Sequence, residues 1–312
     1  MPNPSYVLRR ILQIVPTLLF IMIATFVVVR LLPGDPASAI LGDRASAADI
    51  ARIDAQLGLN QPVPMQFLLF TERVLHGDLG QSTSLRMPVS TLILQRLPVT
   101  LMLTAMAAVL AVILALPLAF LAAMQSGKAS DIGIRGLFQI GLSMPVFYIG
   151  LVFLTVFSAR LHWFPVGGYG DTFGEHLYHL FLPALTLAFS LSAVLMRNLR
   201  ASIIDVLGAE YVDFARAKGL RPRLILLRHI LRNALISTVT VFGLSIGALL
   251  GGAVITETVF AIPGAGRLMI DSISGRDYPT VQGLAMVMAV LVSLVFLATD
   301  LVQAALDPRI GR

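Results

Sequence analysis

Residues 205–235 read DVLGAEYVDFARAKGLRPRLILLRHILRNAL, a basic, amphipathic segment between two strongly apolar runs. Each cation in it would cost about 2.5 to 3.5 kcal/mol at the centre of a bilayer helix. The segment is therefore expected to stay in water at a membrane face, where a short charged hairpin can contact a soluble partner. The cations are Arg216, Lys218, Arg221, Arg223, Arg228 and Arg232.

The composition of the rest of the chain predicts a membrane protein. The chain has 312 residues, of which 57% are hydrophobic and 13% are charged, whereas soluble domains contain about 25% charged residues. We expect an all-α polytopic protein with one transmembrane domain over residues 1–312. The net charge of +6 collects at the ends of apolar runs, which indicates membrane orientation and not nucleic-acid binding. The absence of cysteine excludes disulfides, thiolate nucleophiles and Cys-ligated metals.

Six apolar runs are long enough to cross a hydrocarbon layer of about 30 Å. Because these runs are continuous and not alternating, they exclude a β-barrel. Pro145 lies within the third run and predicts a kink that could shape a passage. The expected spans are about 11–32, 99–123, 137–159, 180–196, 237–260 and 281–301.

The hydrophilic loop at about 33–98 is expected to carry short surface helices. Asp35–Pro36 and Ser46–Asp49 resemble helix starts. A further helix is predicted over about 63–76, ending at Gly77, and another over about 89–97, leading into the second span.

Basic residues alternate between the connections and thereby predict the orientation. They occur before the first span, between the second and third spans, in the segment 198–235 and at the C-terminus. The positive-inside rule therefore places both termini and the segment 198–235 in the cytoplasm, and the loop 33–98 outside.

Two glycines divide the segment 198–235. Gly208 separates two helical pieces, and Gly219 is expected to end the second piece. Between them, the spacing of Tyr211, Phe214 and Ala215 predicts that these residues share one helix face. On physical grounds alone, a contact surface and an ordinary solvated loop with a positive-inside bias remain equally open.

ARAKGL at 215–220, followed by HILRNAL at 229–235, resembles the cytoplasmic signature loop of membrane subunits of binding-protein-dependent ABC importers. The family pattern is Glu-Ala-Ala, three residues, then Gly. Ala215 and Gly219 match it outright, Asp213 keeps the charge, and Phe214 departs from it. Arg232 stands where the family has a proline.

These departures match the peptide and nickel permease branch, which the chain resembles along nearly its whole length. The pair LPGDP and HGDLGQS is similar to the B-type subunit of that branch. The branch markers are LPGDP at 32–36, HGDLGQS at 76–82, SMPVF at 143–147, GALLGGAVITETVF at 247–260, RDYP at 276–279 and DPRI at 307–310.

The resemblance implies an ATP-driven importer permease that moves dipeptides, oligopeptides or related solutes, such as nickel complexes or glutathione, by alternating access. It implies a bacterial or archaeal cytoplasmic membrane, lipid contact, a homologous C-type permease, two cytoplasmic ABC ATPases that bind ATP and Mg, and an external solute-binding protein. Residues 198–235 would then be a coupling segment that docks on an ATPase. The coupling residues it implies are Glu210, Tyr211, Asp213, Ala215, Arg216, Lys218 and Gly219.

The chain itself carries no ATPase motif, and we expect no cofactor in it. A phosphate-binding loop needs Gly-x-x-x-x-Gly-Lys-Ser/Thr, and neither lysine, Lys128 nor Lys218, precedes Ser or Thr. A stand-alone secondary carrier would usually need ionisable residues at the membrane centre, and the spans contain almost none.

An intramembrane hydrolase is the other alternative, because residues 243–247 fit Gly-x-Ser-x-Gly. That elbow requires a strand before it, which an apolar helix does not supply. Gly243, Gly247 and Gly251 recur every four residues instead, which favours a smooth ridge for helix packing, with pathway lining as the alternative.

A few polar residues near span ends remain open. His176 and His179 have the spacing of a metal pair, but interfacial histidines are more often hydrogen-bonded surface groups, so no metal site is predicted. Glu257 near the external side is either a cap or loop anchor, or a gate or docking residue. Arg276 and Asp277 are further candidates for a gate or a binding-protein contact.

Overall fold

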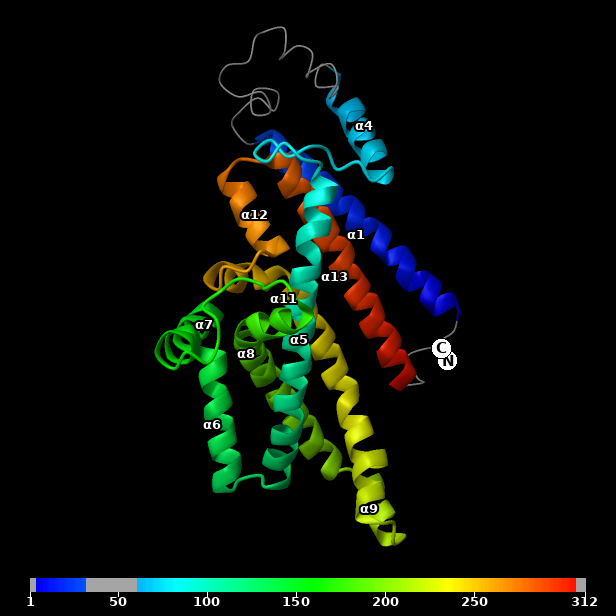
Figure 1. Cartoon of the computed structure of the whole chain (residues 1–312). Helices are drawn as coiled ribbons and strands as arrows, with labels where there is room; N and C mark the ends of the chain where they lie inside the picture. Colours follow the sequence, from blue (N-terminus) through cyan, green and yellow to red (C-terminus); the bar gives the residue numbers. More distant parts are fainter. Residues whose placement is uncertain (1–3, 32–60, 307–312) are drawn as a thin grey trace. The chain divides into compact units, whose positions relative to one another are not determined.

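The computed structural model describes residues 4–31 and 61–306, and these residues are almost entirely helical (Figure 1). Within these ranges there is no strand, only one isolated bridge between Gln81 and Pro88. The helix starts expected at Asp35–Pro36 and Ser46–Asp49 lie outside the described residues. The chain divides into two compact units, and α1, α5 and α13 contribute to both. Of the described residues, unit 1 contains 4–10, 101–262 and 292–306, and unit 2 contains 11–31, 61–100 and 263–291.

Unit 1 is a bundle of packed helices. Alanines four residues apart on α5, Ala111, Ala115 and Ala119, are buried in its core, and such small residues let helices approach closely. Its elements are the later part of α5 (Val89–Met124), α6 (Ala129–Ser143), α7 (Val146–Phe153), the π-helical η1 (Leu154–Arg160), α8 (Phe173–Leu207), α9 (Glu210–Ala217), α10 (Pro222–Leu224), the π-helical η2 (Ile225–Leu231), α11 (Arg232–Val259) and the end of α13.

Unit 2 contains most of α1 (Pro4–Leu31), α4 (Val63–Leu75), the start of α5, α12 (Ala265–Ser274) and the start of α13 (Tyr278–Leu306). Its core buries Val89 and Ile93 of α5 with Leu268 and Leu284. The predicted helix at 63–76 is confirmed as α4, and Gly77 after it has φ +78. The helix expected at 89–97 is confirmed as the first turns of α5.

Among the described residues, five helices are long and apolar enough to cross a membrane, and the number is six if one bent pair counts as a single span. The fourth span was predicted too short, at 180–196, because only its centre is strongly apolar. In the structure a capping box at Thr172 and Glu175 starts α8, and buried Leu199 and Ile203 continue it to Leu207. The helices that qualify are Val7–Val28, Val89–Met124, Phe173–Leu207, Pro222–Gly251 and Tyr278–Leu306.

The third predicted span, 137–159, is not one helix. Helix α6 ends at Ser143, and Met144 is extended with ψ 136° because a following proline disfavours the helical region. Pro145 precedes α7, and the chain bends by 106° between α6 and the α7–η1 arm. The kink predicted at Pro145 is therefore confirmed, as a full break.

Candidate functional site

Two glycines delimit α9, as predicted. Helix α8 ends at Leu207 with Gly208 as its C-cap, and α9 follows from Glu210. Gly219 has φ +70, and its N–H donates to the carbonyl of Arg216 at 2.9 Å. A Cβ there would meet nothing within 4 Å, so glycine is favoured by backbone conformation and not by crowding.

Two residues make the buried face of α9. Val212 and Ala215 are buried, at 0% and 5% exposure, in the core of unit 1. Tyr211 and Phe214 are exposed, at 42% and 67%. Of the three residues predicted to share one helix face, only Ala215 is buried, and Val212 and not Tyr211 accompanies it in the core.

The outer face of α9 is an aromatic surface with a charged rim. Phe214 is flanked by Glu210, Asp213, Arg216 and Lys218, all of them exposed. The Arg216 Nη1 to Asp213 Oδ1 distance is 3.0 Å, but both side chains are more than half exposed, so this pair adds little stability. An exposed aromatic ring within a polar rim is typical of a protein-contact surface.

Hydrogen bonds attach α9 to the helices beneath it. Asn233 Nδ2 donates to Tyr211 Oη at 3.0 Å and to the carbonyl of His229 at 2.8 Å. Helices α8 and α11 are joined by Asn198 and Thr238, whose Nδ2 and Oγ1 are 3.3 Å apart. These contacts connect α9 to α11, and α11 to α8.

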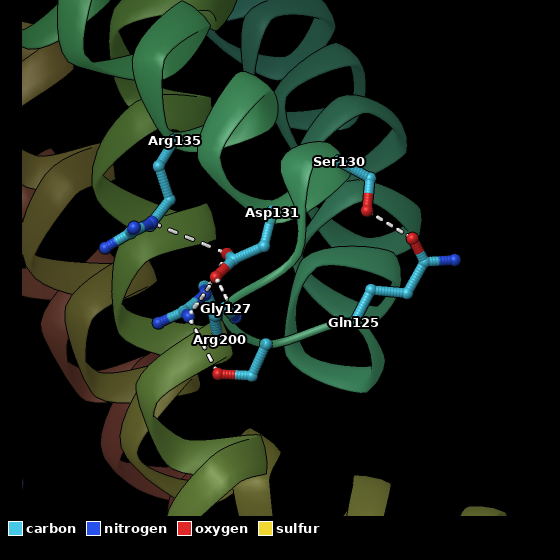
Figure 2. A network of polar contacts seen from close by, with 7 residues as sticks. Gln125, Gly127, Ser130, Asp131, Arg135 and Arg200 are labelled. Atoms are coloured by element: carbon cyan, nitrogen blue, oxygen red, sulfur yellow. Dashed lines mark hydrogen bonds and ion pairs between the residues drawn. The ribbon is translucent and has the colours of Figure 1, made fainter.

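A buried carboxylate at the same end of unit 1 was missed by the sequence analysis (Figure 2). Asp131, fully buried in the first turn of α6, accepts two bonds of 2.7 Å from Nε and Nη2 of Arg200 in α8. It also accepts the N–H of Gly127 at 2.9 Å, while Arg135 Nε lies 3.5 Å away. The predicted third span began only at about 137, so the sequence analysis placed no helix start near Asp131, although the first turn of a helix is a favourable place for negative charge.

The glycine ridge of α11 has two different environments. A Cβ on Gly243 would lie 2.0 Å from Thr299 Oγ1, and one on Gly247 would lie 2.7 Å from Phe296 Cε1, both on α13. A Cβ on Gly251 would meet nothing within 4 Å, and Gly251 is exposed. The first two glycines therefore serve helix packing, and the third leaves a smooth open surface.

Ser245, between these glycines, does not sit in a nucleophile elbow. Its hydroxyl donates to the carbonyl of Val241 at 2.7 Å, within α11. The residues that the structure describes contain no strand to precede such an elbow.

The candidate gate residues differ in exposure. Glu257 is 0% exposed, and its backbone carbonyl accepts the N–H of Ile262 at 2.8 Å. Arg276 is exposed and has φ +54. Asp277 is buried at 1% exposure, which leaves Arg276 as the one of the three that is open to a partner.

Asp277 joins two of the sequence motifs. Its carboxylate accepts the hydroxyl of Ser82, the N–H of Thr83 at 3.1 Å, and both the N–H and the hydroxyl of Thr280, at 3.4 and 2.9 Å. HGDLGQS and RDYP therefore meet in unit 2, and Gly80 also lies close to Pro279 there. The contact fixes the end of the loop before α5 against the start of α13.

The two histidines bind backbone groups. His176 Nδ1 lies 2.9 Å from the carbonyl of Tyr169, and His179 Nδ1 lies 3.0 Å from that of Gly167. They anchor the loop before α8. Across residues 4–31 and 61–306, no cluster of three His, Cys, Asp or Glu side chains could hold a metal ion.

Comparison with known proteins shows the family. Residues 115–312 match the binding-protein-dependent transport system inner membrane component, and residues 4–104 match the N-terminal domain of such membrane components. The glutathione transport system permease protein GsiC of Pectobacterium atrosepticum is 41% identical over 98% of both chains. The oligopeptide transport system permease protein AppB of Bacillus subtilis is 39% identical over 98% of this chain and 99% of its own.

The fold has solved counterparts. An inward-facing MetNI methionine ABC transporter chain superposes with a TM-score of 0.58 at 16% identity, covering 69% of this chain and 96% of that one. At this identity the match shows the fold alone. With the family models and the full-length relatives, the chain belongs to the inner-membrane permeases of binding-protein-dependent ABC importers, as a multi-pass membrane subunit and not as the ATPase.

Proposed function

We propose that this chain is the B-type permease of a peptide importer. A homologous C-type permease completes the pathway, two cytoplasmic ATPases bind ATP and Mg, and an external binding protein delivers the solute. The proposed solutes are glutathione-sized peptides and oligopeptides, because relatives near 40% identity are named for transport of glutathione and of oligopeptides. The motif resemblance to the peptide and nickel branch supports the same solute class.

The outer face of α9 is the observation that carries the coupling role. Phe214 is 67% exposed within a charged rim, while Val212 and Ala215 hold α9 to the core. Such a helix can insert its ring into a groove on an ATPase without loosening its base. The alternation of basic connections supports a cytoplasmic position for α9 and for both termini.

In this proposal, alternating access arises because α9 is connected to the long helices α8 and α11. ATP binding draws the two ATPases together and displaces α9. The Tyr211–Asn233 and Asn198–Thr238 contacts pass that displacement to α8 and α11. A coupling element transmits only if its contacts differ between the two states, and ATPase closure supplies that difference. The open surface at Gly251 is proposed to face the pathway or the second permease.

Substitution of Gly219 tests this proposal. We expect Gly219→Trp, and separately Asp213→Lys, to reduce ATP-dependent peptide uptake by about tenfold or more, with normal membrane insertion. Uptake of glutathione and tri-alanine is measured in proteoliposomes, together with the amount of ATPase that co-purifies.

Gly77→Trp is the matched control. Gly77 also has a positive φ of +78 and open space around its Cβ position, but it lies in unit 2, after α4. It carries the same backbone strain without the ATPase contact, so ATPase co-purification is expected to persist. Wild-type uptake and ATPase binding in Gly219→Trp would show that α9 is not the coupling element.

The hydrolase alternative predicts that Ser245 is essential for activity. An intramembrane hydrolase would lose its activity in Ser245→Ala, whereas a permease should keep its transport. The Ser245 hydroxyl is already bonded within its own helix, which supports the permease.

A further inference from the structure

Arg200 holds two consecutive parts of the chain at once. Its guanidinium donates to both carboxylate oxygens of Asp131 at the start of α6. Its Nη2 also lies 3.3 Å from the hydroxyl of Ser126 in the α5–α6 loop. Asp131 closes the same loop by accepting the N–H of Gly127. A planar guanidinium with two parallel bonds fixes orientation as well as distance. The α5–α6 loop therefore has one defined position on α8.

The position of Arg200 along α8 connects this contact to α9. Arg200 lies seven residues before Leu207, the last residue of α8, which is about 10 Å along a helix. Gly208 and Ala209 then lead directly into α9. The α5–α6 turn and α9 lie at the same end of unit 1, the lower end in Figure 1. A movement of α9 that displaces the end of α8 is therefore applied to Arg200 within two turns.

Helix α6 is also held to α8 farther along. The rings of Phe138 and Phe189 stack with centroids 6.4 Å apart, and a Cβ on Gly141 would lie 3.0 Å from Phe189 Cε1. Beyond the break at Pro145, a Cβ on Gly150 of α7 would lie 3.3 Å from Thr186 Cγ2 of α8. The apolar contacts hold α6 and α7 against α8, and the Asp131–Arg200 pair fixes where α6 begins.

A gain in folding stability alone does not explain why a charged pair occupies this buried position. Desolvation offsets much of the attraction between buried charges, so an apolar pair of similar volume often stabilises a fold as well. What the ion pair adds is a fixed geometry near the coupling helix. We propose that Asp131 and Arg200 are positioning residues that carry the displacement of α9 and α8 to the α5–α6 loop, and so to the broken helix α6–α7. This inference rests on the proposed coupling role of α9.

A distance measurement tests directly whether the Asp131–Arg200 pair keeps the α5–α6 loop fixed on α8. The chain has no cysteine, so spin labels can be placed at Lys128→Cys in the loop and Asp205→Cys near the end of α8, both exposed positions. The complex is assembled with cysteine-free partner subunits. We expect the interspin distance to be the same in the nucleotide-free and ATP-bound states. A change larger than the width of the distribution, with the ion pair intact, would overturn the proposal.

Coupling efficiency supplies the second test. In proteoliposomes, Arg200→Gln should reduce glutathione or tri-alanine imported per ATP hydrolysed by about tenfold, while ATPase activity is retained. Arg200→Lys keeps the charge but loses the paired bonds, and should fall between Arg200→Gln and the wild type. Arg135→Gln is the matched control, because Arg135 approaches the same carboxylate from a side chain that is 53% exposed.

An apolar replacement separates positioning from plain stability. Asp131→Leu combined with Arg200→Met removes both charges and fills the site with apolar side chains. We expect this double variant to have the protein amount and melting temperature of the wild type but to import less peptide per ATP. If this double variant, or Arg200→Gln, imports as much peptide per ATP as the wild type does, the positioning role of the pair is refuted. If the wild-type assembly itself shows no ATP-dependent uptake, the proposed function fails instead.

Discussion

Two buried carboxylates, one in each unit, fix distant parts of this permease by different chemistry. Asp131 joins α6 to a residue 69 positions away in the sequence, and Asp277, just before α13, binds one 195 positions away. Their exposures are 0% and 1%. Asp131 is held by arginine N–H groups and a backbone N–H, whereas Asp277 is held by two hydroxyls and two backbone N–H groups.

The difference lies in which partners can reverse their role. Guanidinium and backbone N–H groups only donate, whereas a hydroxyl both donates and accepts. Both oxygens of Asp131 face donors only. In Asp277, Oδ1 faces the backbone N–H groups, and Oδ2 faces the hydroxyls of Ser82 and Thr280. The two sites therefore make different demands on the residue that occupies them.

The largest effect is expected from an amide at position 131. In Asp131→Asn the new NH₂ group must face Arg200 or Gly127, both of them donors, and the arginine loses its counter-charge. In Asp277→Asn the NH₂ group can replace Oδ2 and donate to the two hydroxyls. We expect Asp131→Asn to lower the apparent melting temperature by on the order of 10 °C, and Asp277→Asn to have little effect.

Thermal unfolding of the two variants in nanodiscs, with the wild type alongside, checks this difference. Equal losses at the two positions would break the comparison, since they would show that burial alone and not partner chemistry decides the tolerance of each site.

A smaller effect is expected when Asp277 loses its side chain entirely. Asp277→Ala leaves the N–H groups of Thr83 and Thr280 without the acceptor that Oδ1 provides. A buried donor left unsatisfied costs about 1–3 kcal/mol, so the melting temperature should fall by about 5 °C. Thr280→Val, which removes one hydroxyl and keeps its volume, should cost less.

Susceptibility of the loop before α5 to limited proteolysis gives an independent measurement. The loop should open in Asp277→Ala and stay protected in Asp277→Asn. Protection of both variants would mean that the Ser82 and Thr83 contacts do not hold this loop.

Features governed by a few neighbouring residues could be predicted from the sequence. Gly208 and Gly219 delimit α9 because of their backbone freedom, and Pro145 breaks its helix because it restricts Met144 and lacks an N–H. Which face of α9 is buried could not be predicted, because a helix of eight residues makes barely two turns. So short a pattern does not fix which stripe is buried, and the position of Val212 depends on Ile225 and Ile230 of the following segment.

Contacts between distant residues could not be predicted from single-chain patterns. The motifs HGDLGQS and RDYP were both identified, but nothing in either one indicates that Ser82 binds Asp277. Asp131 and Arg200 belong to no motif, and an isolated acid and an isolated arginine have many possible partners. The glycine ridge shows the same limit, because its spacing left packing and pathway lining open for all three glycines and did not indicate that Gly251 differs from Gly243 and Gly247.

The smallest effect is expected from substitution of Arg135. It tests whether the Asp131 site depends on the total positive charge around it or on the geometry of its hydrogen bonds. Arg135 Nε is 3.5 Å from Oδ1 and its side chain is 53% exposed, so water and salt screen the attraction. Arg135→Gln should therefore shift the melting temperature by about 1 °C or less, and added salt should remove even that difference. Arg200→Gln should remain strongly destabilised at any salt concentration because its contact is buried. If the two substitutions had equal effects, Asp131 would respond to total positive charge, and the paired bonds of Arg200 would not distinguish this site from Asp277.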